Sequence, residues 1–161
     1  MIDRVLGRAA AALALAGGVV VLAAVAVCSV SIAGRWLADA PVLGDVELMQ
    51  LGCVVAISCF LPWCQTRDAH VRVDFFTQRA SALAQRRMDR AGHLLMAMVM
   101  LLVAARTSTG VAEMREAGET TMLLGLPVWM AYLCLVPGLL LSGLIALRAA
   151  FATATVPDRR A

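Results

Sequence analysis

Four long apolar runs, separated by polar connections, dominate the pattern of this sequence. The runs extend over about residues 9–33, 46–64, 91–112 and 122–147. A helix needs roughly 20 apolar residues to cross a hydrocarbon core of about 30 Å. The pattern therefore predicts an all-α integral membrane protein, in which four transmembrane helices form a single domain of residues 1–161.

The first run resembles the start of a secretory signal peptide because Arg4 and Arg8 precede it. The apolar core of a signal peptide has only about 7–15 residues, however, and this run is longer. The bulky Val27 just before Cys28 also argues against cleavage at a lipoprotein site. We expect the first helix to be retained.

A charged connection, residues 65–90, separates the second and third runs. Within it, Phe76, Ala80 and Leu83 follow helical spacing, and four arginines are interleaved with them: Arg79, Arg86, Arg87 and Arg90. This combination is typical of a short amphipathic helix that lies along the membrane surface, with its arginines reaching lipid phosphates. A connector that simply faces water is the alternative.

The other connections are short. Residues 35–45 contain the turn formers Pro41 and Gly44, and residues 113–121 form an acidic turn. Inside the fourth run, Pro127 and Pro137 each predict a kink, which a membrane helix tolerates when its neighbours satisfy the freed carbonyls.

The arginines predict the orientation of the chain, because cytoplasmic connections carry an excess of positive charge. Both ends and the long central connection share one side, with eleven arginines: Arg4, Arg8, Arg67, Arg72, Arg79, Arg86, Arg87, Arg90, Arg148, Arg159 and Arg160. The opposite side holds Arg35 and Arg115, with Arg106 near it, among acidic residues. We expect both termini in the cytoplasm of a bacterium, and the protein in its inner membrane.

Composition supports a membrane protein and gives no sign of nucleic-acid binding. Of the residues, 61% are hydrophobic and 16% charged, against about a half and a quarter in soluble domains. The net charge of +3 comes from arginines spread along the chain, so no basic nucleic-acid surface is indicated. The five cysteines lie in apolar runs, where a thiol behaves as a small hydrophobic group.

Ionisable groups at mid-membrane usually mark a transport pathway or a catalytic site. The centres of the first, second and fourth runs have none, and Arg106 in the third is within reach of the outer surface. Two interpretations of Arg106 remain open. It either pairs with Glu47 or Glu113, or acts as an interfacial arginine that sets the depth of its helix.

No catalytic, cofactor or metal site is predicted. The two histidines, His70 and His93, both fall near the cytoplasmic side, and the other helices offer none to complete a bis-histidine haem site. The sequence also has no Walker loop and no HExxH or GxSxG motif. We therefore expect no enzyme. The alternatives are a four-helix membrane redox enzyme or electron carrier, and a small homodimeric exporter.

Two stretches of the chain have a distinctive order of residues. The first, Arg67-Asp68-Ala69-His70-Val71-Arg72-Val73-Asp74, is a basic, His-containing segment that follows the second span. The second is Gly118-Glu119-Thr120-Thr121 with Leu126-Pro127-Val128-Trp129, Tyr132 and Pro137, a turn that leads into the last helix. Together with Glu47 at the head of the second span, these stretches resemble the small membrane subunit, of the DctQ type, of tripartite ATP-independent periplasmic (TRAP) transporters.

The resemblance implies a function. In this family a periplasmic binding protein delivers an organic acid, such as a C4-dicarboxylate, keto acid or sugar acid, to two membrane subunits. The large subunit carries the substrate and sodium sites and moves by an elevator mechanism. The small subunit is its static partner. By this resemblance the chain is a non-catalytic scaffold of a sodium-driven importer, with the large subunit, the binding protein and the bilayer as partners.

The resemblance also suggests roles for single residues. Arg67, His70, Arg72 and Asp74 would form a polar network that fixes the surface helix, although solvation of the inner connection is the alternative. Arg79, Arg86 and Arg87 would anchor it to lipid. Glu119 belongs to an acidic outer rim that would face the binding protein, unless the rim is only a set of solvated turns. Pro127 and Trp129 mark the start of the last helix, and tryptophan commonly lies at membrane interfaces.

Overall fold

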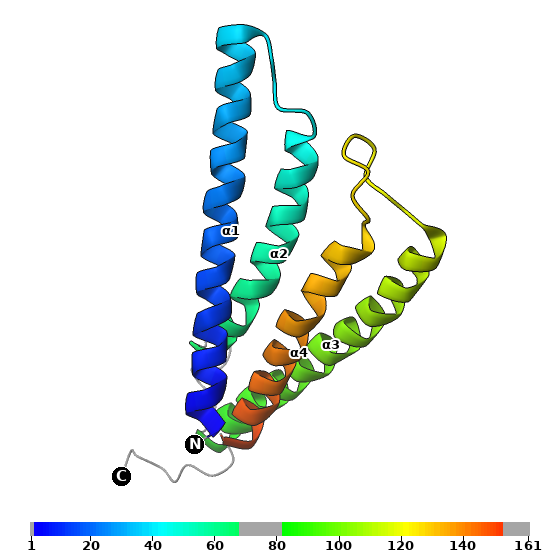
Figure 1. The fold of residues 1–161 in the computed structure, drawn as a ribbon. Coiled ribbons are helices and arrows are strands. Elements are labelled where there is room, and N and C mark those ends of the chain that lie inside the picture. The colour runs from blue at the N-terminus through cyan, green and yellow to red at the C-terminus, as the bar shows by residue number, and fades with distance from the viewer. Residues whose placement is uncertain (1, 68–81, 153–161) are drawn as a thin grey trace.

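A computed structural model describes residues 2–67 and 82–152 of the chain (Figure 1). Four helices make up nearly all of this part: α1 (Ile2–Ala38), α2 (Asp45–Thr66), α3 (Ala82–Ala117) and α4 (Trp129–Ala152). Each is long and apolar enough to cross a membrane. The prediction of an all-α protein with four membrane-spanning helices is confirmed at this level.

The helices lie in a row rather than in a closed bundle. α2 packs against α1 on one side and α4 on the other, and α4 packs in turn against α3, which gives the spatial order α1–α2–α4–α3. The α1–α2 pair and the α3–α4 pair converge where α1 begins and α4 ends, and they spread apart toward the opposite end (Figure 1). The row therefore leaves two broad faces uncovered.

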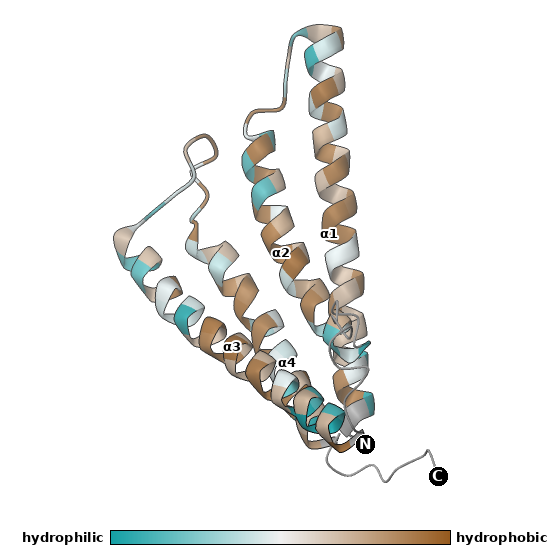
Figure 2. Cartoon of the chain, turned by 180° about the vertical axis from the view of Figure 1, so that it is seen from behind, coloured by the Kyte–Doolittle hydropathy of each residue, from teal (hydrophilic) through white to brown (hydrophobic). Residues whose placement is uncertain are grey.

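Apolar side chains surround the helices on most sides. In Figure 2 hydrophobic positions cover the middle of each helix, and hydrophilic ones gather toward the helix ends. Among the large exposed hydrophobic side chains, Leu15, Leu22, Ile57 and Leu102 lie on three different helices. Water would penalise such a surface, whereas lipid or another membrane protein accommodates it.

Small residues set the close approach of the helices. Gly17 of α1 faces Cys59 of α2, and an added Cβ would lie 2.8 Å from the Cys59 Cβ. Gly143 of α4 faces Leu101 of α3 in the same manner, at 2.9 Å. Because lipid removes the hydrophobic driving force between membrane helices, packing through such small residues is what holds them together.

The tightest approach joins α2 to α4. A Cβ on Gly138 would overlap the backbone and the hydroxyl of Ser58. The Ser58 hydroxyl lies 3.2 Å from the carbonyl oxygen of Cys134 and 3.0 Å from that of Leu135. Both carbonyls lie in the turn before Pro137, although the carbonyl that the missing N–H of Pro137 leaves free is that of Leu133, four residues earlier. Ser58 thus bonds to backbone groups of α4 close to its proline, and satisfaction of the freed carbonyl by a neighbour stays a prediction.

Both ends of the third helix lie further out in the structure than the sequence predicted. Residues 82–90, assigned to the connection between the second and third runs, form the first turns of α3. At its other end α3 continues to Ala117, so Glu113 and Glu116 lie on the helix and not in a turn. Charged side chains such as Arg and Glu are good helix formers, so a helix can continue into polar sequence beyond its apolar segment. Hydropathy therefore locates the membrane span but not the ends of the helix. The surface helix stays a prediction, since residues 68–81 lie outside the described part.

The start of the fourth helix was placed too early. Met122 begins the apolar run, but α4 starts only at Trp129. Gly125 has φ +64°, a left-handed conformation that a helix does not use, and Pro127, two residues later, forms an isolated bridge with Thr120. The apolar residues between Thr120 and Pro127 belong to a loop, which hydropathy alone does not distinguish from a helix.

Candidate functional site

Glu47, in the first turns of α2, holds the loop between α3 and α4. Its carboxylate accepts a hydrogen bond from the backbone N–H of Leu123 at 2.8 Å and another from that of Leu124 at 3.0 Å. The two bonds join positions 76 and 77 residues apart in the chain. A carboxylate that accepts from two adjacent backbone donors fixes both the position and the direction of that backbone.

The loop is also closed by its own hydrogen bonds. The N–H of Thr121 donates to the Leu126 carbonyl at 2.9 Å, and the Leu126 N–H donates to the Thr121 hydroxyl at 3.1 Å. The N–H of Val128 donates to the Glu119 carbonyl at 3.1 Å. The backbone of residues 119–128, which we call the Glu47-held loop, is therefore tied at its neck by these bonds and at its tip by Glu47.

One side of the loop tip packs against the start of α2 and the other is open. Leu124 lies directly over Gly44, where an added Cβ would overlap its side chain. Gly44 has φ +74°, so its lack of a side chain serves both the turn into α2 and this contact. Met122 at the same tip is 99% exposed, and Leu123 is also exposed. A rigid backbone thus presents two apolar side chains.

The end of α3 is fixed before the loop begins. Gly118 has φ +65°; its N–H donates to the Arg115 carbonyl, and the next N–H, of Glu119, donates to the Met114 carbonyl. This is the Schellman arrangement, which satisfies the last carbonyls of a helix. The Arg115 guanidinium lies 5.6 Å from the centre of the Trp129 ring, so a cation–π contact links the end of α3 to the start of α4.

A second polar cluster closes the neighbouring α1–α2 connection. The hydroxyl of Ser31, fully buried in α1, donates to the Asp45 carboxylate and accepts from the N–H of Val42 at 3.3 Å. The guanidinium of Arg35 lies 4.0 Å from the same carboxylate. Both interhelical connections at this end are therefore held by a carboxylate near the start of α2, through Asp45 on one side and Glu47 on the other.

Of the residues named beforehand, several fall at this end of the molecule. Glu119 and Pro127 contribute backbone to the Glu47-held loop, and Trp129 begins α4. The resemblance singled out Glu47 by its place at the head of the second span, and the structure gives it a partner. That partner is the backbone of the loop.

The predicted basic residues lie at the opposite end. Arg67 caps α2 and stacks on Trp63, with 4.7 Å between its guanidinium carbon and the ring centre. Arg86 is half-buried and Arg87 exposed in the first turns of α3. Four of the named positions lie outside the described residues, so the proposed polar network and lipid anchors remain predictions for them: His70, Arg72, Asp74 and Arg79.

Arg106 is exposed on α3. Within residues 2–67 and 82–152, no carboxylate lies within ion-pair distance of its guanidinium. Glu47, one of the two partners considered for it, bonds to the Glu47-held loop instead. Among the described residues Arg106 is therefore paired with neither of the two carboxylates considered, and its interfacial role stays a prediction.

Two hydroxyl residues of these contacts were not anticipated: Ser31 and Ser58. Each is an isolated polar residue within an apolar run, where serine is unremarkable in sequence. Thr121 was named as part of a motif, but its hydrogen bond to the Leu126 N–H was not predicted.

The arrangement is suited to holding segments in place. In the part of the chain that the structure describes, no three side chains of His, Cys, Asp or Glu gather as metal ligands would. The charged and hydroxyl groups instead bond to backbone at helix ends and crossings, which rigidifies the ends and the α2–α4 contact.

Comparison with known families gives one match. The model of the family described as "Tripartite ATP-independent periplasmic transporters, DctQ component" matches residues 24–156, most of the chain. A search of curated proteins found no match. The matched region begins within α1 and includes the Glu47-held loop, both polar clusters and the α2–α4 crossing.

Proposed function

Because the chain belongs to the DctQ family, the small components of tripartite ATP-independent periplasmic transporters, we propose that it is the static scaffold subunit of a sodium-driven importer of an organic acid. The match over residues 24–156 carries this proposal. Transporters of this kind also contain a large membrane component and a substrate-binding protein. We propose that this chain forms a heterodimer with the large component, and that it is not an enzyme.

The distribution of charge supports a role without transport chemistry of its own. Between Ala9 and Gly34, between Leu48 and Thr66, and between Met130 and Leu147 the sequence has no Asp, Glu, Lys or Arg. A proton- or ion-coupled carrier would place such groups near mid-membrane. In the large component, by contrast, substrate and sodium sites need polar groups there. The small chain supplies apolar surface instead.

The shape also supports a scaffold. A row of four helices has two wide faces, and one can lie against a partner while the other faces lipid (Figure 1). The polar contacts of Ser58, Asp45 and Glu47 resist sliding of one helix against the next. An element that moves across the membrane needs such a fixed surface beside it.

The orientation is part of the proposal. We place the Glu47-held loop on the periplasmic side and the ends of the chain in the cytoplasm of a bacterial inner membrane, on the strength of the arginine distribution. The start of α1 and the end of α4 lie at the same end of the row, as four spans require. Glu119 and the exposed loop tip would then face the binding protein.

Affinity purification of the tagged chain from its host's membranes in mild detergent tests the proposal, with mass spectrometry of the proteins that accompany it. We expect a much larger polytopic membrane protein in about equal amount, and uptake of an organic acid by that pair in vesicles only with the binding protein and a sodium gradient. Recovery of the chain alone, active in vesicles, would overturn the scaffold role in favour of the homodimeric exporter. A haem or quinone absorbance would favour the redox alternative.

A further inference from the structure

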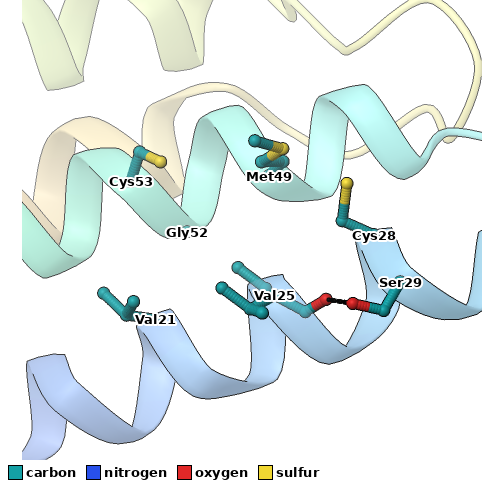
Figure 3. A pocket seen from close by; sticks show the side chains of 8 residues that line it. Val21, Val25, Cys28, Ser29, Met49, Gly52 and Cys53 are labelled. Atoms are coloured by element: carbon teal, nitrogen blue, oxygen red, sulfur yellow. Dashed lines mark hydrogen bonds between the residues drawn. The ribbon is translucent and has the colours of Figure 1, made fainter.

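α1 and α2 leave an apolar groove between them, in the half of the pair nearer their connecting loop (Figure 3). Its volume is about 200 Å³. Its walls come from both helices, chiefly Val21, Val25 and Cys28 of α1 and Met49, Gly52 and Cys53 of α2. Gly52 packs against α1, with an added Cβ 3.4 Å from the Ala24 Cβ, so it forms the floor where the helices touch.

The polar atoms that line the groove are few, and its one hydroxyl is already hydrogen-bonded. The hydroxyl of Ser29 donates to the carbonyl of Val25 at 2.8 Å, one turn earlier in the same helix (Figure 3). The thiols of Cys28 and Cys53 are weak hydrogen-bonding groups. A groove with so few polar partners does not hold ordered water, and it suits a hydrocarbon.

The wall contributed by α1 continues past the groove to the end of the helix. Val21, Val25, Cys28, Ile32 and Trp36 follow one another at intervals of three and four residues and so share one face. Ile32 is 63% exposed and Trp36 is 86% exposed. Since tryptophan settles at the boundary between hydrocarbon and headgroups, this face runs from the bilayer interior to its surface.

Arg35 lies seven residues after Cys28 and so follows it on the same face of α1, beyond the groove. Its side chain is 64% exposed, and its one carboxylate neighbour among the described residues, Asp45, is 4.0 Å away. An ion pair at that distance with an exposed guanidinium is weak, and a guanidinium has five N–H donors. Most of its donors therefore remain available to an oxyanion at the membrane surface, and phosphate is the anion to which guanidinium geometry is matched.

The vertical distances fit one leaflet. From Val21 to Ile32 a helix rises about 16 Å, at about 1.5 Å per residue. Half of a hydrocarbon core of about 30 Å is about 15 Å. A lipid whose phosphate lies at Arg35 would therefore extend one acyl chain along the whole groove and end near the bilayer centre.

We propose that the α1–α2 groove is a binding site for one acyl chain of a phospholipid whose phosphate is held by Arg35. The proposal requires only that the helices cross a membrane, and it does not depend on the scaffold function. The groove holds about 200 Å³, too little for a further helix, which is about 10–12 Å wide. A bound chain would fill the seam through which α1 is chiefly attached to the rest of the row.

Photo-crosslinking tests the site. The purified chain, together with any large subunit that accompanies it, is placed in vesicles of phosphatidylethanolamine and phosphatidylglycerol. A phosphatidylglycerol with a diazirine on one acyl chain is added as the probe. Mass spectrometry of peptides after illumination should find adducts concentrated on the groove walls, above those on the exposed far side of α1, such as Val30.

Three variants test whether the adducts depend on the groove and on the charge of Arg35. Cys53→Trp fills the groove from an exposed position and should abolish the groove adducts. Val30→Trp adds the same ring on the far side of α1 and should leave them unchanged. Arg35→Gln leaves the groove open but removes the charge, and should lower the adducts about fivefold to tenfold, the effect expected from losing a charge-assisted hydrogen bond.

Adducts spread evenly over all exposed helix faces, and unaffected by Cys53→Trp, would overturn the proposal. A groove that carries no adducts when the large subunit is present, but gains them in the purified chain alone, would also overturn it, since the large subunit would then cover the groove. Arg35→Gln alters an exposed side chain and leaves the Ser31–Asp45 hydrogen bond in place, so it tests the site even if Cys53→Trp proves unstable.

Discussion

The carboxylate of Glu47 at the head of α2 bonds to the backbone N–H groups of Leu123 and Leu124, at the tip of a loop that begins after α3. α2 and α3 are not neighbours in the row, because α4 lies between them. The two bonds therefore attach the loop between α3 and α4 directly to α2, on the far side of α4. They define the shape of that end of the molecule.

Replacing Glu47 should release the loop. In Glu47→Gln one of the two acceptor oxygens becomes an amide that cannot accept, so amide exchange at Leu123 or Leu124 should accelerate, by about tenfold or more, as local opening becomes easier. Hydrogen–deuterium exchange with mass spectrometry in detergent measures this. Glu116→Gln, at an exposed position of α3, removes the same charge without touching the loop and should leave the exchange unchanged. Equal exchange in both variants would show that Glu47 does not hold the loop.

Ser58 should stabilise the α2–α4 contact through its hydroxyl. Ser58→Ala removes the donor to the carbonyls beside Pro137, which should cost about 0.6 kcal/mol, the mean for such bonds between membrane helices. Thermal unfolding in detergent measures the change. A variant as stable as the parent would mean that the carbonyls of α4 do not need this donor.

Gly138 should be far more sensitive to substitution than a glycine with open space around it. Gly138→Leu forces a side chain into Ser58 and should destabilise the fold by about 1–3 kcal/mol, as overpacking of a tight contact does. Gly18→Leu, at a position of α1 with no atom within 4 Å of an added Cβ, is the matched control and should be tolerated. If thermal unfolding in detergent gave both variants the same stability, α2 and α4 would not approach as closely as described.

Ser31 should fix the α1–α2 connection. Ser31→Ala leaves the buried face of α1 without the hydroxyl that binds Asp45 and Val42, at an expected cost of about 1 kcal/mol. Limited proteolysis should then cut more quickly between residues 39 and 44. Ser29→Ala is the control, since that exposed hydroxyl bonds only within its own helix. Cleavage at the parent rate in Ser31→Ala would contradict the assigned role.

Gly118 should be required in its left-handed conformation. With φ +65° at the end of α3, Gly118→Ala should cost about 1–2 kcal/mol, the penalty of that backbone region for a residue with a Cβ. Gly92→Ala, within α3 and with open space around it, should instead stabilise the helix slightly. Thermal unfolding of the two variants in detergent provides the comparison, and the two changes should have opposite signs.

The sequence predicted the number of membrane helices well and their ends less well. Hydropathy located four apolar segments because lipid imposes that composition over about 20 residues. It placed Met122 in a helix because Met122, Leu123 and Leu124 are as apolar as a span, although Gly125 and Pro127 make them a loop. The helix α3 extends from Ala82 to Ala117, beyond the apolar run on both sides. Hydropathy did not detect these extensions, since the first and last turns of α3 are polar.

The candidate site was predicted only in part, and for a physical reason. Glu47 stood out as a carboxylate at a helix start, yet its partners are backbone N–H groups, which every residue possesses and no sequence pattern marks. Ser31 and Ser58 each contribute one hydroxyl, and whether that hydroxyl forms a stabilising hydrogen bond depends on which group lies opposite it. The sequence therefore predicted features that depend on residue type, such as a carboxylate at a helix start. It did not predict contacts that depend on which group lies opposite in the fold.

The spatial order α1–α2–α4–α3 has a consequence for biogenesis. As the chain is synthesised, the first three helices enter the membrane before the fourth, but α2 and α3 have no mutual contact of their own. α4, the last to emerge, must take its place between two helices already inserted, with Gly138 against α2 and Gly143 against α3. Until then α3 lacks its one helix partner among the described residues, α4, so a ribosome that stops short of α4 leaves a product that quality-control proteases should recognise.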